Sequence, residues 1–194
     1  RPGSEELVRI ASDELHYLDY EEALAFYEHF RQWTTDPRDI AFLAANDRFY
    51  LLTILLNRRD ALHPWIYDRC REVEGSPDGH LDLWARWHFK SSLITVPGSI
   101  QEIIRDPEIT VCIFSHSRDI ARAFLRQIKM ELETNAKLHQ AFPDVFWSDP
   151  RKQALKGAED DGIVVKRKTN PKEATIEAWG LVDGQPTSKH YRRM

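Results

Sequence analysis

The most constraining feature of the sequence is the run Ile-Thr-Val-Cys-Ile-Phe at Ile109–Phe114. A continuous stretch of β-branched and apolar residues is typical of a strand buried on both faces of a parallel sheet. The residues after it predict a helix that begins at about Ser117. Its expected core face has apolar residues at steps of four, namely Ile120, Phe124, Ile128 and Leu132. This order favours an α/β fold in which helices flank a mostly parallel sheet.

The chain before this run is predicted to be helical. Helical spacing of apolar residues is present in three stretches, Tyr20–Trp33, Ile40–Leu56 and Pro64–Glu74. The Gly- and Pro-containing segment at positions 75–79 then predicts a loop and a domain boundary. We therefore expect a helical N-terminal subdomain at 1–79 and a second domain at 80–194. Net charge also changes there, because residues 1–79 carry nine basic and 16 acidic side chains whereas the remainder is mildly basic.

Further elements are expected in the second domain. Short strands are predicted at His80–Ala85, Ile163–Val165 and Thr175–Trp179, the last two as neighbours in a β-meander. Helices are predicted at Ser91–Ile104 and Asn135–Phe142.

Composition excludes several classes of protein. Apolar residues make up 42% and charged residues 30% of the chain, which is ordinary for a globular domain and excludes a disordered one. No stretch approaches the roughly 20 apolar residues that span a bilayer, so no membrane partner is expected. The two cysteines exclude a disulfide framework and favour a reducing compartment.

The segment at positions 84–92 is the candidate phosphate-binding loop, because it joins a predicted strand to a predicted helix, as a P-loop does. In a P-loop, a lysine at this place reaches the β- and γ-phosphates and the next hydroxyl binds Mg²⁺. Lys90 and Ser91 have these positions. The free N–H groups at a helix N-terminus favour the same anion. Arg86 would add a second cation near the γ-phosphate.

The segment departs from the P-loop consensus at two positions. Trp84 and Phe89 stand where the consensus has glycine, which lets the backbone approach phosphates closely. The spacing alone therefore leaves an alternative in which Arg86 and Lys90 are surface charges at a helix start.

A resemblance favours the phosphate-binding interpretation. The residues HFKSSLIT, followed by IQEIIRDPEITVCIFSHSRDIARAFLRQIKMELETN, resemble the ATPase domain of phage terminase large subunits, the motors that package DNA into capsids. The upstream run DRFYLLTILLNRRDALHPWIYDRCREVE is similar to the helical lead-in of that family. The resemblance extends from about Asp47 to Arg193. It implies a P-loop NTPase fold of the ASCE, helicase-like kind, preceded by a helical subdomain.

The resemblance also implies cofactors and site residues. ATP and Mg²⁺ are the implied cofactors, with Arg86 and Lys90 as catalytic residues and Ser91 as the Mg²⁺ ligand. The implied nucleotide-binding residues are Arg86, Trp87, His88, Phe89, Lys90, Ser91, Ser92 and Arg69. For the last of these, the family places an adenine-contacting segment in the preceding helix. The alternative is that its aromatic residues, Trp65 and Tyr67, belong to the core.

The implied partners are double-stranded viral DNA, the small terminase subunit and the portal protein. The family assembles as a ring of identical subunits on the procapsid, in the host cell cytoplasm. An acidic Walker B strand is expected after the segment GLVDGQPTSKHYRR, beyond Met194, so the sequence is expected to be a fragment that lacks this acid. A rival assignment takes Gly180–Asp183 as the Walker B strand, although Asp183-Gly184 also predicts a hairpin turn.

Two other functions stay open. One is a different helicase-like P-loop NTPase that acts on DNA. The other is a DNA-binding or assembly module without ATP hydrolysis, because both loop glycines are missing. Three segments are candidates for DNA contact or coupling: Ser115–Ser117 after the buried strand, and the basic stretches Lys166–Lys168 and Lys189–Arg193. A helix cap and solvated strand ends are the alternatives for these segments.

Overall fold

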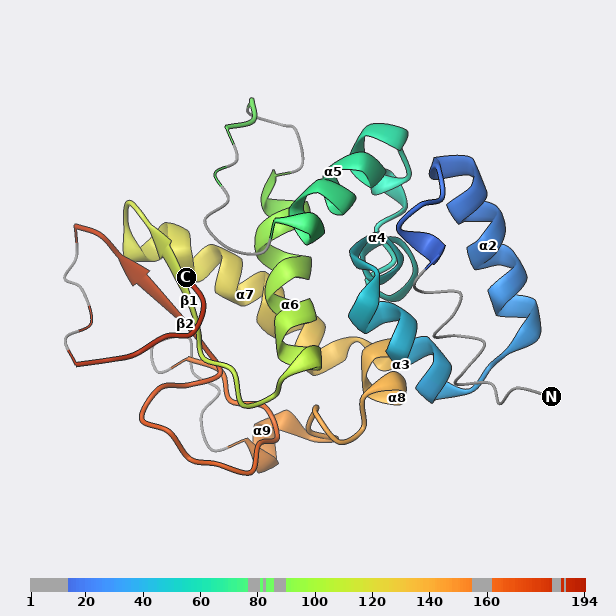
Figure 1. Cartoon of the computed structure of the whole chain (residues 1–194). Coiled ribbons are helices and arrows are strands. Elements are labelled where there is room, and N and C mark those ends of the chain that lie inside the picture. Colours follow the sequence, from blue (N-terminus) through green and yellow to red (C-terminus); the bar gives the residue numbers. More distant parts are fainter. Residues whose placement is uncertain are drawn as a thin grey trace. The chain divides into compact units, whose positions relative to one another are not determined.

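The computed structural model has a mixed α/β fold with helices and a two-stranded parallel sheet (Figure 1). It describes residues 14–76, 81, 83–85, 90–154, 162–182, 186 and 188–194. The chain divides into two compact units, Arg1–Pro97 and Gly98–Met194. The division falls later in the chain than the predicted boundary at residues 79 and 80, within a continuous helical stretch from Lys90 to Arg105.

Unit 1, Arg1–Pro97, is helical where it is described. Its elements are α2 (Tyr20–Trp33), α3 (Pro37–Asn46), α4 (Arg48–Tyr50), η1 (Leu51–Leu55), η2 (Arg59–Ala61), α5 (Pro64–Gly75) and η3 (Ser91–Thr95). The predicted helices at Tyr20–Trp33 and Pro64–Glu74 are confirmed. The single helix predicted at Ile40–Leu56 is wrong, because Asp47 has an extended backbone between α3 and α4. Its carboxylate accepts a hydrogen bond from the Tyr50 N–H and caps the new helix.

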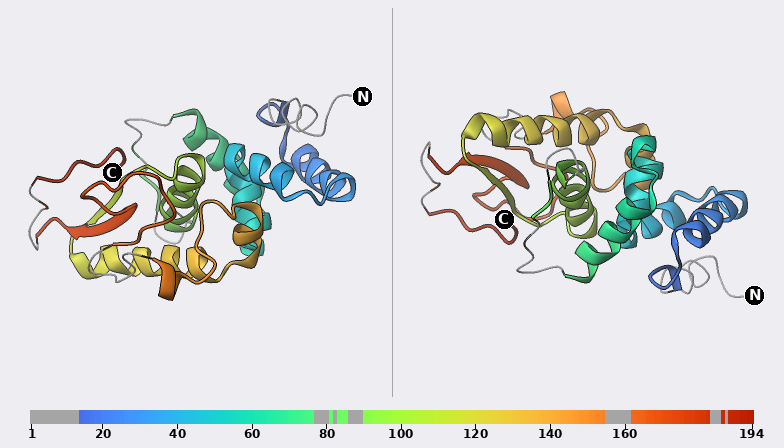
Figure 2. Two further views of the ribbon diagram at one scale, coloured as in Figure 1. Left: turned by 90° about the horizontal axis from the view of Figure 1, so that it is seen from below. Right: turned by 90° about the horizontal axis from the view of Figure 1, so that it is seen from above.

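An aromatic cluster forms the core of unit 1. The rings of Tyr27 and Tyr50 have centroids 5.2 Å apart, and those of Phe49 and Tyr67 are also 5.2 Å apart. Both pairs have edge-to-face geometry, which aromatic rings favour. Figure 2 shows α2, in blue, beside the helices that supply the other rings. Tyr67 therefore belongs to the core, as one of the sequence alternatives held.

Unit 2, Gly98–Met194, contains the sheet. Its elements are most of α6 (Val96–Arg105), with β1 (Val111–Ser115), α7 (Arg118–Thr134), α8 (Ala136–Ala141), α9 (Pro150–Gln153) and β2 (Ile176–Gly180). The strand predicted at Ile109–Phe114 is confirmed as β1, and its first three residues are buried. β1 pairs with β2 in parallel, from Val111 opposite Ile176 to Ser115 opposite Gly180. Helix α7 packs against both strands (Figures 1 and 2).

The core face of α7 differs in part from the predicted one. Ile120 is 47% exposed, whereas Ala121 and Leu125 are fully buried beside the expected Ile128 and Leu132. A helix turns once in 3.6 residues, so a row of residues at steps of four rotates away from the core over three turns. The buried set instead follows alternating steps of four and three, which stays on one face.

The predicted β-meander is wrong at its first strand. Ile163 makes only an isolated antiparallel bridge to Ile176, and no strand spans Ile163–Val165. The strand predicted at Thr175–Trp179 is confirmed as β2, but its partner is the parallel β1. Gly162 lets the chain approach this edge, because its φ is 83° and a Cβ there would lie 2.7 Å from the Ile176 carbonyl oxygen.

Candidate functional site

The helical stretch that is described from Lys90 on holds the described part of the predicted phosphate site. Lys90 is the first helical residue after the undescribed segment 86–89, and its side chain is exposed. Ser91 and Ser92 follow Lys90 in the sequence and are half-buried. Within the described ranges, none of these three side chains has a hydrogen bond or an ion pair. A cation and two hydroxyls are thus available to a ligand in this part of the described chain.

A π-helical turn, η3, follows Lys90 and covers Ser91–Thr95. Two residues later the chain has Pro97, which lacks an N–H group and whose ring crowds the carbonyl four residues earlier. The wider turn accommodates this proline without ending the helix, since α6 continues to Arg105. The helix predicted at Ser91–Ile104 is therefore confirmed, with a change from π-helical to α-helical pitch after Thr95.

The strand predicted to precede the loop does not form in the part that can be described. Residues 81 and 83–85 have no strand assignment, so the prediction for His80–Ala85 is wrong at these positions. Leu81 and Leu83 are 77% and 84% exposed, so they lack the burial that a central strand requires. Arg86, Trp87, His88 and Phe89 lie outside the described residues.

A pair of tryptophans lies beside Arg69 in unit 1. Trp65 on α5 and Trp84 have ring centroids 5.2 Å apart, in edge-to-face geometry. The Arg69 guanidinium stands 6.0 Å from the Trp65 ring centroid and also forms an ion pair with Glu72. Trp65 and Trp84 are half-buried, so this cluster combines flat apolar surface with a cation. Sequence analysis identified Arg69 and Trp65 but not their proximity to Trp84.

In unit 2, the carboxyl ends of both strands meet at one edge of the sheet. The Leu181 N–H donates to the Ser115 carbonyl at 2.9 Å, and the Val182 N–H donates to the His116 carbonyl at 3.3 Å. Ser117 is at the N-cap position of α7, but its side chain makes no capping hydrogen bond. Ligands of open α/β sheets bind at this edge.

The structure at the same edge does not favour the rival Walker B assignment at Gly180–Asp183. β2 ends at Gly180, and the next two residues, Leu181 and Val182, are 54% and 62% exposed. A strand that carries a Walker B acid would be buried up to that acid. Asp183 itself lies outside the described residues.

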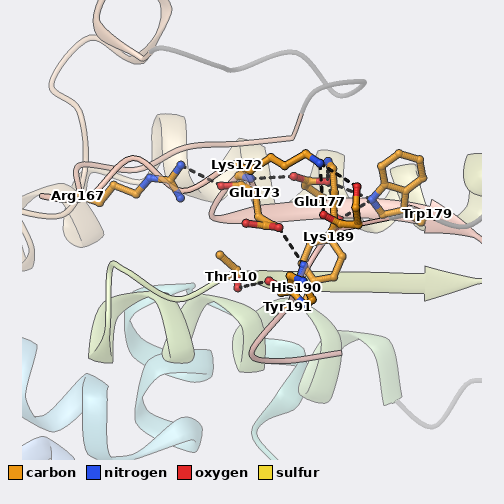
Figure 3. Close-up of polar contacts among 11 residues, drawn as sticks. Thr110, Arg167, Lys172, Glu173, Glu177, Trp179, Lys189, His190 and Tyr191 are labelled. Atoms are coloured by element: carbon orange, nitrogen blue, oxygen red, sulfur yellow. Dashed lines mark hydrogen bonds and ion pairs between the residues drawn. The ribbon is translucent and has the colours of Figure 1, made fainter.

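A polar network at β2 was not predicted from the sequence (Figure 3). The buried Glu177 carboxylate accepts hydrogen bonds from the Ala174 N–H at 2.7 Å and the Tyr191 hydroxyl at 2.7 Å, and it pairs with the Lys189 ammonium. The Trp179 indole N–H donates to both Glu177 and the Tyr191 oxygen.

The network has clear electrostatic consequences. Burial raises the pKa of Glu177, but the hydrogen bonds outweigh it and the net pKa is lowered. Burial, reinforced by the bond to Glu177, raises the pKa of Tyr191. The carboxylate is therefore ionised and the tyrosine neutral near pH 7. The position of Glu177 inside an apolar strand gives no periodic signal that could have identified it.

The two basic stretches have internal partners. Arg192 pairs with Asp106 at 2.7 Å and Arg193 with Glu102 at 3.4 Å, while Lys189 is bound to Glu177. The Arg193 carbonyl accepts from the Cys112 N–H at 2.9 Å, so this segment runs beside β1. In the other stretch, the Arg167 guanidinium donates to the Glu173 carbonyl at 3.0 Å.

No family model, curated protein or solved structure matches this chain. In the part of the chain that the structure describes, no helix is both long and apolar enough to cross a membrane. The same part contains no group of three or more His, Cys, Asp or Glu side chains that could hold a metal ion.

Proposed function

We propose that this chain is the ATP-binding portion of a phage terminase large subunit, with a P-loop NTPase fold, which powers translocation of viral DNA into the procapsid. The observation that carries the proposal is the helical stretch described from Lys90 on, with Ser91 and Ser92 next to the lysine. Their side chains have no partner among the described residues, as expected of groups that await a ligand. The sequence resemblance supplies the identity of that ligand.

Each residue of the proposed site would have a role that follows from its chemical type. Lys90 would neutralise the phosphates of ATP, and the Ser91 hydroxyl would bind Mg²⁺. Arg86 would stabilise the charge that develops on the transferred phosphoryl group. Bound Mg-ATP would supply the phosphoryl chemistry. Backbone and side chains of Trp87, His88, Phe89 and Ser92 would complete the cradle.

The tryptophan pair gives the proposal a base-binding element. The half-buried rings of Trp65 and Trp84 offer apolar surface on which a purine can stack. Arg69 lies beside Trp65 and could donate hydrogen bonds to the base. Trp84 and Lys90 both belong to unit 1, and the proposal is that they contact the same nucleotide.

The sheet in unit 2 supports the wider assignment. Two parallel strands with α7 packed on them are the unit from which α/β NTPase sheets are built. Ser115–Ser117 at the carboxyl edge would face double-stranded viral DNA. As a terminase subunit in the host cytoplasm, the protein would form a ring of identical copies on the procapsid. It would then contact the portal protein and the small terminase subunit.

Thermal unfolding in the presence of Mg-ATPγS tests nucleotide binding. Ligand at 100 times its dissociation constant should stabilise the parent protein by about 2.7 kcal/mol. Lys90→Ala should lose that stabilisation because its ammonium is the proposed phosphate ligand. Lys152→Ala is the matched control, since Lys152 is an exposed lysine whose side chain is 83% accessible. A shift that survives in Lys90→Ala would contradict the assignment of the site.

The two alternative functions predict other results. A DNA-binding module without ATP hydrolysis should show no shift with Mg-ATPγS, and Lys90→Ala should leave DNA affinity unchanged. A different helicase-like NTPase should show the nucleotide shift but no binding to portal protein or small terminase subunit.

A further inference from the structure

The loop at Lys166–Lys172 in unit 2 encloses a carboxylate from a distant part of the chain. Glu108 lies just before β1, yet its side chain is bound by the backbone N–H groups of Lys168 and Thr169 and by the Thr169 hydroxyl. The Thr169 N–H to Glu108 oxygen distance is 3.1 Å. Three donors from two consecutive residues therefore converge on one anionic group.

This donor arrangement is not specific for a carboxylate. Successive backbone N–H groups in a turn form a concave site that binds phosphate and other oxyanions. A threonine hydroxyl adds a third donor, as in many phosphate sites. A phosphate group has enough oxygens to satisfy all three donors that Glu108 now satisfies.

The loop at Lys166–Lys172 is rich in cations. The loop has four cations, Lys166, Arg167, Lys168 and Lys172. In the described part of the chain, the Lys168 ammonium makes no hydrogen bond or ion pair. One guanidinium nitrogen of Arg167, Nη1, is buried and has no hydrogen-bond partner there. Glu108, Glu173 and Glu177 all act on Arg167, but Glu173 accepts from the His190 N–H and Glu177 pairs with Lys189. Lys168 is therefore the cation of the loop that keeps its attraction for an anion.

We propose that Lys168 and Thr169 form a phosphate-binding site that Glu108 occupies as an internal competitor. A phosphate group displaces Glu108 and takes over its three donors, with Arg167 and Lys168 supplying charge. The phosphate comes either from the DNA backbone or from a free phosphate ion, which share this chemistry. The proposal does not depend on nucleotide binding at Lys90, which is in the other unit.

The hydrogen bonds to Glu108 also indicate its charge state, and with it how well Glu108 competes with phosphate. The bonds from Thr169 and Lys168, together with the Arg167 charge, hold the pKa of Glu108 below its usual value, so it is ionised near pH 7. Removing the carboxylate should therefore free a preformed site. The site should bind anions more tightly in Glu108→Ala than in the parent.

The test is an amide NMR titration with inorganic phosphate at constant ionic strength. In Glu108→Ala, the N–H signals of Lys168 and Thr169 should shift with phosphate, and the affinity should be at least tenfold higher than in the parent. Glu133→Ala is the matched control, because it removes a carboxylate of the same unit that pairs with Lys129 at 3.7 Å. That control should bind phosphate like the parent.

Glu108→Gln is a second test in case Glu108→Ala unfolds the loop locally. Its amide keeps the side-chain length and one hydrogen-bond acceptor. It should also bind phosphate more tightly than the parent. If neither variant shows phosphate-dependent shifts of Lys168 and Thr169, the proposal is overturned. Thr169→Val in the Glu108→Ala background should weaken phosphate binding, and an unchanged affinity would also overturn it.

A titration with a short DNA duplex distinguishes the two sources of phosphate. If the duplex shifts the same two amides at lower phosphate concentration than the free ion does, the site serves the DNA backbone. The affinity for the duplex should then fall with salt, because phosphate contacts release counterions. If only the free ion shifts them, the site takes a small phosphate.

Discussion

Each unit of this protein buries a carboxylate that is bound by a tyrosine and a cation. In unit 1, Asp47 accepts from the Tyr27 hydroxyl at 2.6 Å and from the Arg71 guanidinium at 2.9 Å. In unit 2, Glu177 accepts from the Tyr191 hydroxyl and the Lys189 ammonium. The chemistry is the same, but the elements that the two networks join are different.

The Asp47 network joins regular helices. Its partners come from α2 and α5, and the Asp47 side chain, 1% exposed, also caps α4. Arg71 continues the network to Glu74, which accepts from the Arg48 N–H. The Glu177 network instead holds an irregular C-terminal segment against a strand, and its Lys189 side chain is 22% exposed. A buried carboxylate can thus either connect helices to one another or position a segment that has no regular structure.

The largest effect is expected from Asp47→Ala. This change removes one of the two carboxylates that pair with Arg71 and the acceptor of Tyr27, so the free energy of unfolding should fall by about 3–5 kcal/mol. Urea unfolding followed by far-UV circular dichroism measures it. Glu28→Ala, which removes an exposed pair with Arg31, should change stability by less than about 0.5 kcal/mol. If both changes lowered the free energy of unfolding equally, the Asp47 network would contribute no more stability than an exposed ion pair.

Glu177→Gln should have a smaller effect because Lys189 can recover solvent contact. We expect a loss of about 1.5–3 kcal/mol, the range for hydrogen bonds to a charged group. Urea unfolding followed by far-UV circular dichroism measures this loss as well. Glu133→Gln is the matched control on α7. A loss larger than that of Asp47→Ala would reverse the comparison between the units.

The contribution of Glu177 should also depend on pH. Its folded-state pKa is lowered, so the unfolded protein binds the proton more readily. The stabilisation is therefore fully present above the unfolded pKa of about 4.3 and is lost as pH falls through the folded pKa. The difference in unfolding free energy between parent and Glu177→Gln should shrink over that acid range. A constant difference from pH 7 to pH 3 would contradict the ionised state of Glu177.

The smallest effects are expected from the two tyrosine hydroxyls. Burial, reinforced by the adjacent carboxylate, raises the pKa of both Tyr27 and Tyr191, so each is a neutral donor near pH 7. Tyr27→Phe and Tyr191→Phe should each cost about 1 kcal/mol. Tyr27 should have the larger effect, because it is 2% exposed whereas Tyr191 is half-buried. Urea unfolding of the two variants measures both losses of stability. A larger loss in Tyr191→Phe than in Tyr27→Phe would contradict this order.

Local pattern predicted most of the regular structure. The β-branched run at Ile109–Phe114 predicted β1, and Pro64 at a helix start predicted α5. The pattern was less informative where one side chain changes the backbone. Asp47 breaks a continuous apolar stretch because its carboxylate caps the next helix, and Ile163 meets β2 at a single bridge.

The candidate site shows a similar limit. The sequence predicted a helix at Ser91–Ile104, and the described residues 90–105 are helical. The sequence did not predict that Trp84 would lie against Trp65, because that contact joins segments about 20 residues apart. The predicted strand before the loop was wrong where it can be described, since its apolar residues Leu81 and Leu83 are exposed.

By itself, the sequence determined the helices that are described in unit 1, the buried strand β1 and the helical stretch that follows Lys90. These depend on neighbours within one or two turns, which the order of residues fixes. Only the tertiary structure decided that β2 pairs with β1, that Glu177 meets Lys189 and Tyr191, and that Glu108 occupies the loop at Lys168. Such contacts join distant residues, and their stability comes from burial and charge that exist only once the chain has folded.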